Sequence, residues 1–88
     1  MVGADVDPSK AARLVQRYPD LDLDLRVVEP GDLAILAAPA DVLAPCATGG
    51  VLSPETIPEI KAPIVCGAAN NQLEDPVRDA EALAARGV

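Results

Sequence analysis

Short apolar runs alternate with helix signals along the whole sequence, and this alternation constrains the fold more than any other feature. The first run leads into Asp5, and Asp7 is suited to cap a helix that begins at Pro8. Pro19 then ends that helix. Within it, apolar residues recur at helical spacing and form one stripe: Ala11, Leu14, Val15 and Tyr18.

The next segment is ambiguous. Leucine and aspartate alternate over residues 21–25, which is typical of a half-buried strand, and residues 26–28 form a second strand or a continuation of the first. The three aspartates between positions 20 and 24 fit a solvated edge, because the glycine and later glutamate of a calcium loop are missing. After a turn, Asp32 caps a short helix that runs to about Ala38.

Two apolar runs in the second half read as buried parallel strands, over residues 41–45 and 63–67. Between them, Ser53 begins one or two helical turns that Pro58 interrupts. Asp75 caps a last helix that stops near Gly87. Its expected apolar face consists of Val77, Ala80, Leu83 and Ala84. Strands that alternate with helices predict an α/β fold with a parallel sheet.

Composition excludes several classes of function. The chain has 88 residues, enough for one small domain, and Tyr18 is its only aromatic residue. A net charge of -7 disfavours nucleic acid and anionic membranes as partners, and the absence of histidine excludes imidazole metal sites and His-dependent triads. No metal site is expected. No signal peptide or spanning segment is visible, so we expect a cytoplasmic protein whose Cys46 and Cys66 are buried, reduced thiols.

Three places at predicted strand ends could hold a ligand, because ligands of doubly wound sheets bind there. Asp5 could accept hydrogen bonds from both ribose hydroxyls of an adenine dinucleotide, and Asp7 already has a structural duty as a cap. The small residues at 45–50 would let the backbone approach a flat ligand, or form a tight turn. Asn70 and Asn71 offer amide groups to a cleft, or form an Asx-turn or a capping pair.

Together these elements resemble a known family. Residues 41–52, then 55–57, then 67–73 look like the coenzyme domain of the Glu/Leu/Phe/Val dehydrogenases, closest to the leucine, phenylalanine and valine branch. Residues 4–7 match the end of that domain's second strand, and the match is loosest over 20–38. The resemblance implies oxidative deamination of an L-amino acid to a 2-oxo acid, with hydride passed to NAD.

The resemblance also implies roles for individual residues. It places Asp5 and Val6 at the adenosine ribose, and Cys46 and Ala47 along the coenzyme cleft. It places Asn70, with or without Asn71, at the nicotinamide or the substrate amino group. It implies no catalytic residue here, because the family's catalytic lysines and aspartate belong to a substrate domain. Lys10 and Lys61 read as surface charges, and Thr48 departs from the larger apolar residue common in relatives.

The family's first strand and its glycine-rich phosphate loop have no match in the sequence. We therefore expect residues 1–88 to form a partial dinucleotide-binding domain, a Rossmann-type sheet with strands 2 to 5 only. In the order 3-2-1-4-5-6 the missing strand lies in the middle. Unpaired buried backbone groups cost ~1–3 kcal/mol each, so the isolated chain should be unstable without a partner chain, an upstream segment or a rearranged register.

Two functions remain open at this point. The chain is part of the NAD-binding half of an amino-acid dehydrogenase, inactive alone and meeting its amino-acid substrate only in a full-length context. Alternatively, it is a truncated, non-catalytic chain that folds only with a partner or has no function. A flavodoxin-like regulatory domain is a weaker third possibility, because Lys61 precedes its strand instead of following one.

Overall fold

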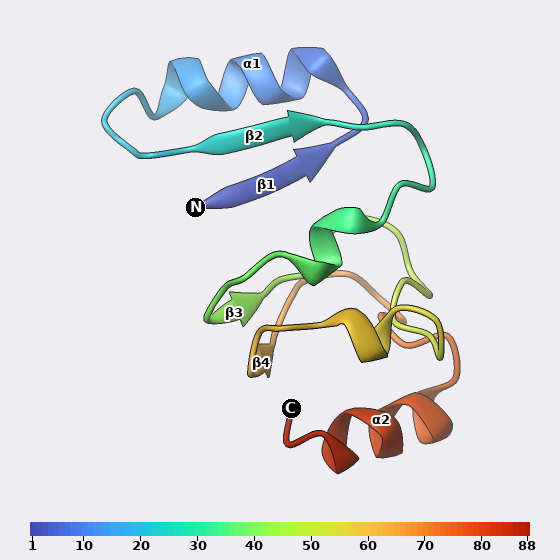
Figure 1. Cartoon of the computed structure of the whole chain (residues 1–88). Coiled ribbons are helices and arrows are strands. Elements are labelled where there is room, and N and C mark those ends of the chain that lie inside the picture. The colour runs from blue at the N-terminus through green and yellow to red at the C-terminus, as the bar shows by residue number, and fades with distance from the viewer. The chain divides into compact units, whose positions relative to one another are not determined.

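The computed structural model describes residues 1–88 and contains four strands, two α-helices and two short 3-10 helices (Figure 1). In chain order they are β1 (Val2–Asp5), α1 (Pro8–Arg17), β2 (Asp24–Val27), η1 (Ala34–Ala37), β3 (Val42–Leu43), η2 (Ile57–Glu59), β4 (Ile64–Val65) and α2 (Pro76–Ala85). The chain divides into two units, Met1–Ile35 and Leu36–Val88, and each is described by itself. The expected alternation of strands and helices, and with it the α/β class, is confirmed.

The first unit consists of two parallel strands and the helix that connects them. Strands β1 and β2 pair in parallel register from Val2 opposite Asp24 to Asp5 opposite Val27, and α1 contacts both (Figure 1). As predicted, Asp7 caps α1: its carboxylate accepts a hydrogen bond of 2.9 Å from the Ser9 amide. No residue of this unit is buried, so it has no core of its own.

The strand expected over residues 21–25 was placed too early. Residue 26 onward is a continuation of one strand that begins at Asp24, where the Asp24 amide donates to the Met1 carbonyl at 2.9 Å. Leu21 lies outside the strand and is 58% exposed. The pairing partner β1 begins at Val2, and this sets where the ladder starts whatever the local alternation of side chains.

The second unit holds the buried core. Strands β3 and β4 pair in parallel, with Leu43 opposite Val65, and an isolated parallel bridge joins Leu52 to Leu73. The core cluster is formed by the buried residues Leu52, Ile57, Ile60 and Ala62, against which Leu43, Val51, Val65, Leu73, Ala82 and Leu83 pack. Most of the core therefore comes from the segment between the two strands and from α2.

Three expectations about this unit were wrong. Val42 and Ile64 are 48% and 53% exposed, because the β3–β4 sheet packs on the core through one face only. Pro58 does not interrupt a helix; it lies in the first turn of η2, where its missing amide is not needed. Helix α2 does not bury its expected apolar face, since Val77 is 69% exposed.

The caps of the second unit follow the prediction more closely. The Asp75 carboxylate accepts from the amides of Val77 and Arg78, and Gly87 ends the helix region with a φ of +78°. In the first unit, the Asp32 carboxylate likewise accepts from the Ala34 amide at 3.0 Å, ahead of η1. Both α-helices have ten residues, and none is long and apolar enough to cross a bilayer.

Candidate functional site

The two segments that follow β3 and β4 run side by side, and we call residues 46–52 and 67–74 the paired loops. Backbone hydrogen bonds join their C-terminal halves: the Gly50 amide donates to the Asn71 carbonyl at 2.7 Å, and the Leu52 amide donates to the Gln72 carbonyl at 3.0 Å. The Glu74 amide returns to the Leu52 carbonyl at 2.9 Å. Four of the predicted site residues, Cys46, Ala47, Asn70 and Asn71, thus lie on two adjoining segments.

Two glycines make this close approach possible. A Cβ atom at Gly67 would collide with the backbone of Pro45, the residue that ends the β3 run. At Gly49, a Cβ atom would lie 2.9 Å from the carbonyl oxygen of Asn70. The small residues that the sequence placed after each strand therefore have a structural reason, which is the contact between the loops.

The two asparagines differ in what the fold asks of them. Asn71 has a φ of +52°, in the left-handed region that asparagine tolerates better than most residues, so its side-chain type has a backbone explanation. Asn70 has an ordinary backbone, is exposed, and forms no side-chain hydrogen bond within the chain. Its amide is thus available to a ligand, and the structure gives Asn70 no other duty.

Sequence reasoning gave no role to Gln72, although this residue belongs to the motif after β4. Its side chain is half-buried, and Nε2 donates a hydrogen bond of 2.7 Å to the Gly67 carbonyl. The bond closes the segment that carries both asparagines. No periodicity signals such a contact, because a glutamine five residues beyond a glycine is unremarkable in a sequence.

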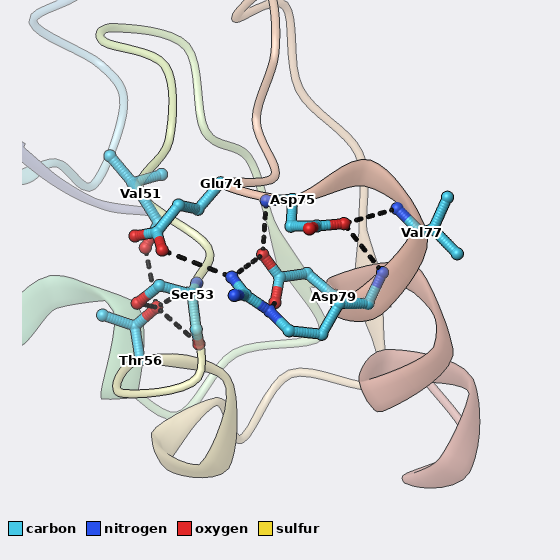
Figure 2. A network of polar contacts seen from close by, with 8 residues as sticks. Val51, Ser53, Thr56, Glu74, Asp75, Val77 and Asp79 are labelled. Atoms are coloured by element: carbon cyan, nitrogen blue, oxygen red, sulfur yellow. Dashed lines mark hydrogen bonds and ion pairs between the residues drawn. The ribbon is translucent and has the colours of Figure 1, made fainter.

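A second polar network, from Ser53 and Thr56, fixes the far end of the first paired loop (Figure 2). The Thr56 hydroxyl donates to the Val51 carbonyl at 2.6 Å and accepts from the Ser53 amide at 2.9 Å. The turn that Ser53 was expected to begin is therefore held by the hydroxyl three residues later. Both bonds flank the core residue Leu52, which lies between Val51 and Ser53 in the sequence.

The same view shows a buried carboxylate on α2 (Figure 2). Asp79 is fully buried, and its two oxygens accept from Arg78 Nε at 2.9 Å and from the Asp75 amide at 2.8 Å. The hydrogen bonds from the Arg78 guanidinium hold the pKa of Asp79 below its ordinary value, against the opposing effect of burial. Asp79 thus stabilises the start of α2 and faces away from solvent.

Arg86 makes the longest-range side-chain contacts of the second unit. From the C-terminal cap of α2, its Nη1 and Nη2 donate to the carbonyls of Ile57 and Ile60 at 2.6 and 2.7 Å. These carbonyls belong to η2 and the residue that ends it. The guanidinium therefore ties the last helix to the segment that supplies half of the core.

The expectation that both cysteines are buried was wrong. Cys46 and Cys66 are free, exposed thiols. The reason is the same one that exposes Val42 and Ile64: one face of the short β3–β4 sheet is not covered by other elements of its unit. Ala47 is exposed as well, so the start of the first paired loop presents small side chains to solvent.

Asp5 and Val6 belong to the first unit, at the end of β1. From the sequence, Asp5 had no structural duty of its own, and this was wrong: one of its carboxylate oxygens accepts a 2.9 Å hydrogen bond from the Asp7 amide. Val6 is 53% exposed. The Ser9 hydroxyl and amide lower the pKa of Asp7, as suits its role as a cap. That Asp5 meets the paired loops at one crevice stays a prediction.

The remaining ionisable groups form no further site. Lys10 and Lys61 are exposed, as expected for surface charges, and so are the three aspartates between positions 20 and 24. No group of three or more His, Cys, Asp or Glu residues is arranged to hold a metal ion. The paired loops and the end of β1 remain the places where the sequence predicts a ligand.

Known proteins resemble the chain in both sequence and structure. L-tryptophan dehydrogenase from Nostoc punctiforme is 41% identical over 85 residues, and valine dehydrogenase from Streptomyces albus is 40% identical over 88 residues. The crystal structure of the Nostoc punctiforme enzyme superimposes with a TM-score of 0.79 and 36% identity over 98% of this chain. By sequence and by fold, the chain is similar to amino-acid dehydrogenases.

The match is to one segment of those enzymes. The chain spans 22% of the tryptophan dehydrogenase and 23% of the valine dehydrogenase. Leucine dehydrogenase from Geobacillus stearothermophilus, 34% identical over 76 residues, is matched over 19% of its length. No protein-family model matches the chain. The resemblance to the leucine, phenylalanine and valine branch is confirmed, and the chain is similar to tryptophan dehydrogenases as well.

Proposed function

We propose that this chain is part of the NAD-binding domain of an NAD-dependent amino-acid dehydrogenase, whose reaction is the oxidative deamination of an L-amino acid to a 2-oxo acid. The observation that carries the proposal is the pair of loops after β3 and β4, where the exposed Asn70 amide has no partner in the chain. These loops occur in a sequence that is similar to amino-acid dehydrogenases over nearly its whole length.

The residues at the strand ends suit a dinucleotide. Cys46 and Ala47 present small, exposed side chains that would let a flat ring lie against the loop, and the Asn70 amide can both donate and accept hydrogen bonds. Asp5 keeps one carboxylate oxygen outside its bond to the Asp7 amide, which suits a ribose hydroxyl and disfavours a 2′-phosphate. NAD, when bound, supplies the hydride acceptor; the chain's own residues bind and orient it.

The strand pairing supports a partial doubly wound sheet. In the order 3-2-1-4-5-6, strands 2 and 3 are neighbours, strands 4 and 5 are neighbours, and strand 1 separates the two pairs. The chain likewise forms two separate parallel pairs, β1–β2 and β3–β4. We assign these four strands as strands 2 to 5, with the first strand and the phosphate-binding loop supplied from outside these residues.

A binding titration with two matched variants tests the proposal. We expect the chain to bind NAD weakly, to prefer it over NADP, and to turn over no amino acid. Asn70→Ala should weaken NAD binding about tenfold, the value of one good hydrogen bond to a ligand. Gln16→Ala, at an exposed residue of α1 outside the predicted site, should leave affinity unchanged within about twofold. Equal affinity for both coenzymes, or equal effects of the two variants, would contradict the assignment.

A second candidate is a non-catalytic chain that folds only with a partner, and a specific observation favours it. No residue of the first unit is buried, and Met1 and Val6 are 72% and 53% exposed. Circular dichroism and sedimentation over a dilution series distinguish the candidates. A helical signal that falls on dilution, without recovery when NAD is added, supports the partner-dependent chain; a folded monomer at every concentration excludes it.

A further inference from the structure

Gln72 stabilises the loop that contains the two asparagines, and it does so through contacts made within that loop. Its Nε2 donates to the Gly67 carbonyl at 2.7 Å, while its own backbone carbonyl accepts from the Leu52 amide at 3.0 Å. One residue therefore ties the end of the loop both to the loop's own first residue and to the neighbouring paired loop. The side chain that does this is half-buried, so water competes less for the bond than it would at an exposed site.

The opposite end of the loop is fixed as well. Gly67 packs so closely against Pro45 that no side chain fits there, and the Ala69 amide donates to the Pro45 carbonyl at 3.0 Å. Asn71 is held in the left-handed conformation and bonded through its carbonyl to the Gly50 amide. Asn70 is thus the residue whose side chain is unbound while the backbone on both sides is constrained.

We propose that Gln72 is a positioning residue for Asn70: by closing the loop between Gly67 and Gln72, it fixes the direction in which the Asn70 amide faces the coenzyme or the amino-acid substrate. The inference rests on the function proposed above and names a residue that acts through another. Gln72 itself contacts neither ligand. If Gln72 served stability alone, replacing it would destabilise the unit without changing the mobility of the Asn70 side-chain amide.

The first test needs no variant and no ligand. In the full chain at concentrations suited to nuclear magnetic resonance, the Nε2 protons of Gln72 should exchange with solvent at least about tenfold more slowly than those of Gln16, the exposed glutamine on α1. Equal exchange rates would overturn the proposal, because the bond to Gly67 would then not be maintained in solution.

The second test uses Gln72→Met, which keeps the length of the side chain and removes the donor. We expect the Asn70 side-chain amide to become more mobile, seen as altered line widths and order parameters, and NAD affinity to fall about fivefold to tenfold. The matched control, Gln16→Met, should change neither quantity. A stability loss with unchanged Asn70 dynamics would overturn the positioning role.

The two proposals can fail separately. If the unmodified chain binds no NAD, the proposed function fails, while the mobility of Asn70 in Gln72→Met still decides whether Gln72 positions it. If NAD binds and Gln72→Met binds it as tightly as before, the function stands and the positioning role is excluded. If Gln72→Met does not fold, the proton exchange of Gln72 in the unmodified chain decides the proposal.

Discussion

The two units begin their helices in the same way and yet bury them very differently. Asp7 with Pro8 starts α1, and Asp75 with Pro76 starts α2, each aspartate accepting from amides of the first turn. Helix α1 buries no residue, whereas α2 buries Asp79 and packs Ala82 and Leu83 against a core.

The comparison separates two kinds of structural information. A cap is a local arrangement of one side chain and the next few amides, so it forms wherever the sequence provides it. Burial depends on a second layer that covers the helix, and in the first unit only the β1–β2 pair is available to cover α1. The first unit should therefore behave as a locally formed structure, and the second as a small cooperative core.

Removing one buried leucine should give the largest effect. Leu52 is 1% exposed at the centre of the core, so Leu52→Ala should lower the free energy of unfolding by about 2–5 kcal/mol. Leu21→Ala, at a residue that is 58% exposed in the first unit, should cost less than about 0.5 kcal/mol. Urea unfolding of both variants measures the difference, and similar losses would refute the contrast between the units.

Removing the clamp at the end of α2 should have the next largest effect. Arg86→Met keeps the aliphatic stem but loses the charged hydrogen bonds to the Ile57 and Ile60 carbonyls, so we expect a loss of about 2 kcal/mol. Arg13→Met on α1 is the matched control, because Arg13 is exposed and forms no ion pair, and it should change stability by less than about 0.5 kcal/mol. Equal effects in thermal unfolding would show that the clamp contributes nothing.

Features set by neighbouring residues could be predicted from the sequence. The aspartate caps, the order of the elements and the small residues of the paired loops all depend on local geometry, and all are present. The approach of the loops also followed from the fold class, because the carboxyl ends of adjacent parallel strands meet at one edge of a sheet.

Features set by distant residues could not be predicted. Arg86 reaches carbonyls 26 and 29 positions earlier in the chain, and Asp79 reads as a surface acid until Arg78 and the Asp75 amide are seen to satisfy it. The exposure of Val42 and of both cysteines had the same origin. An apolar run indicates a strand, but it does not say whether one or both faces of that strand are covered.

Acid should weaken the second unit more than the first. Because the pKa of Asp79 is lowered from 3.8 in the folded chain, the unfolded chain binds the proton first; the stabilisation is full above that value and is lost as pH falls through the folded pKa. Unfolding followed from about pH 6 to about pH 2 should show this loss below pH 3.8, and Asp79→Asn should flatten it. Asp7→Asn should change the pH dependence less, because the Asp7 carboxylate is not buried and water screens its interactions. Identical pH profiles for the two variants would show that the buried Asp79 carboxylate and the Asp7 cap contribute equally to the pH dependence.

Thiol labelling should show the smallest effect. It examines the exposed face of β3 and β4, which is uncovered in the same way as the first unit. Cys46 and Cys66 are exposed on strand ends beside a core, so a thiol reagent such as Ellman's reagent should modify both in the folded chain within about twofold of the rate in urea. Cys46→Ser and Cys66→Ser assign the two rates. Strong protection of either thiol at high chain concentration, relieved on dilution, would mean that another chain covers the exposed face of β3 and β4. Association with another chain would then bury this face. Like the first unit, the face needs a covering layer of structure that its own unit does not contain.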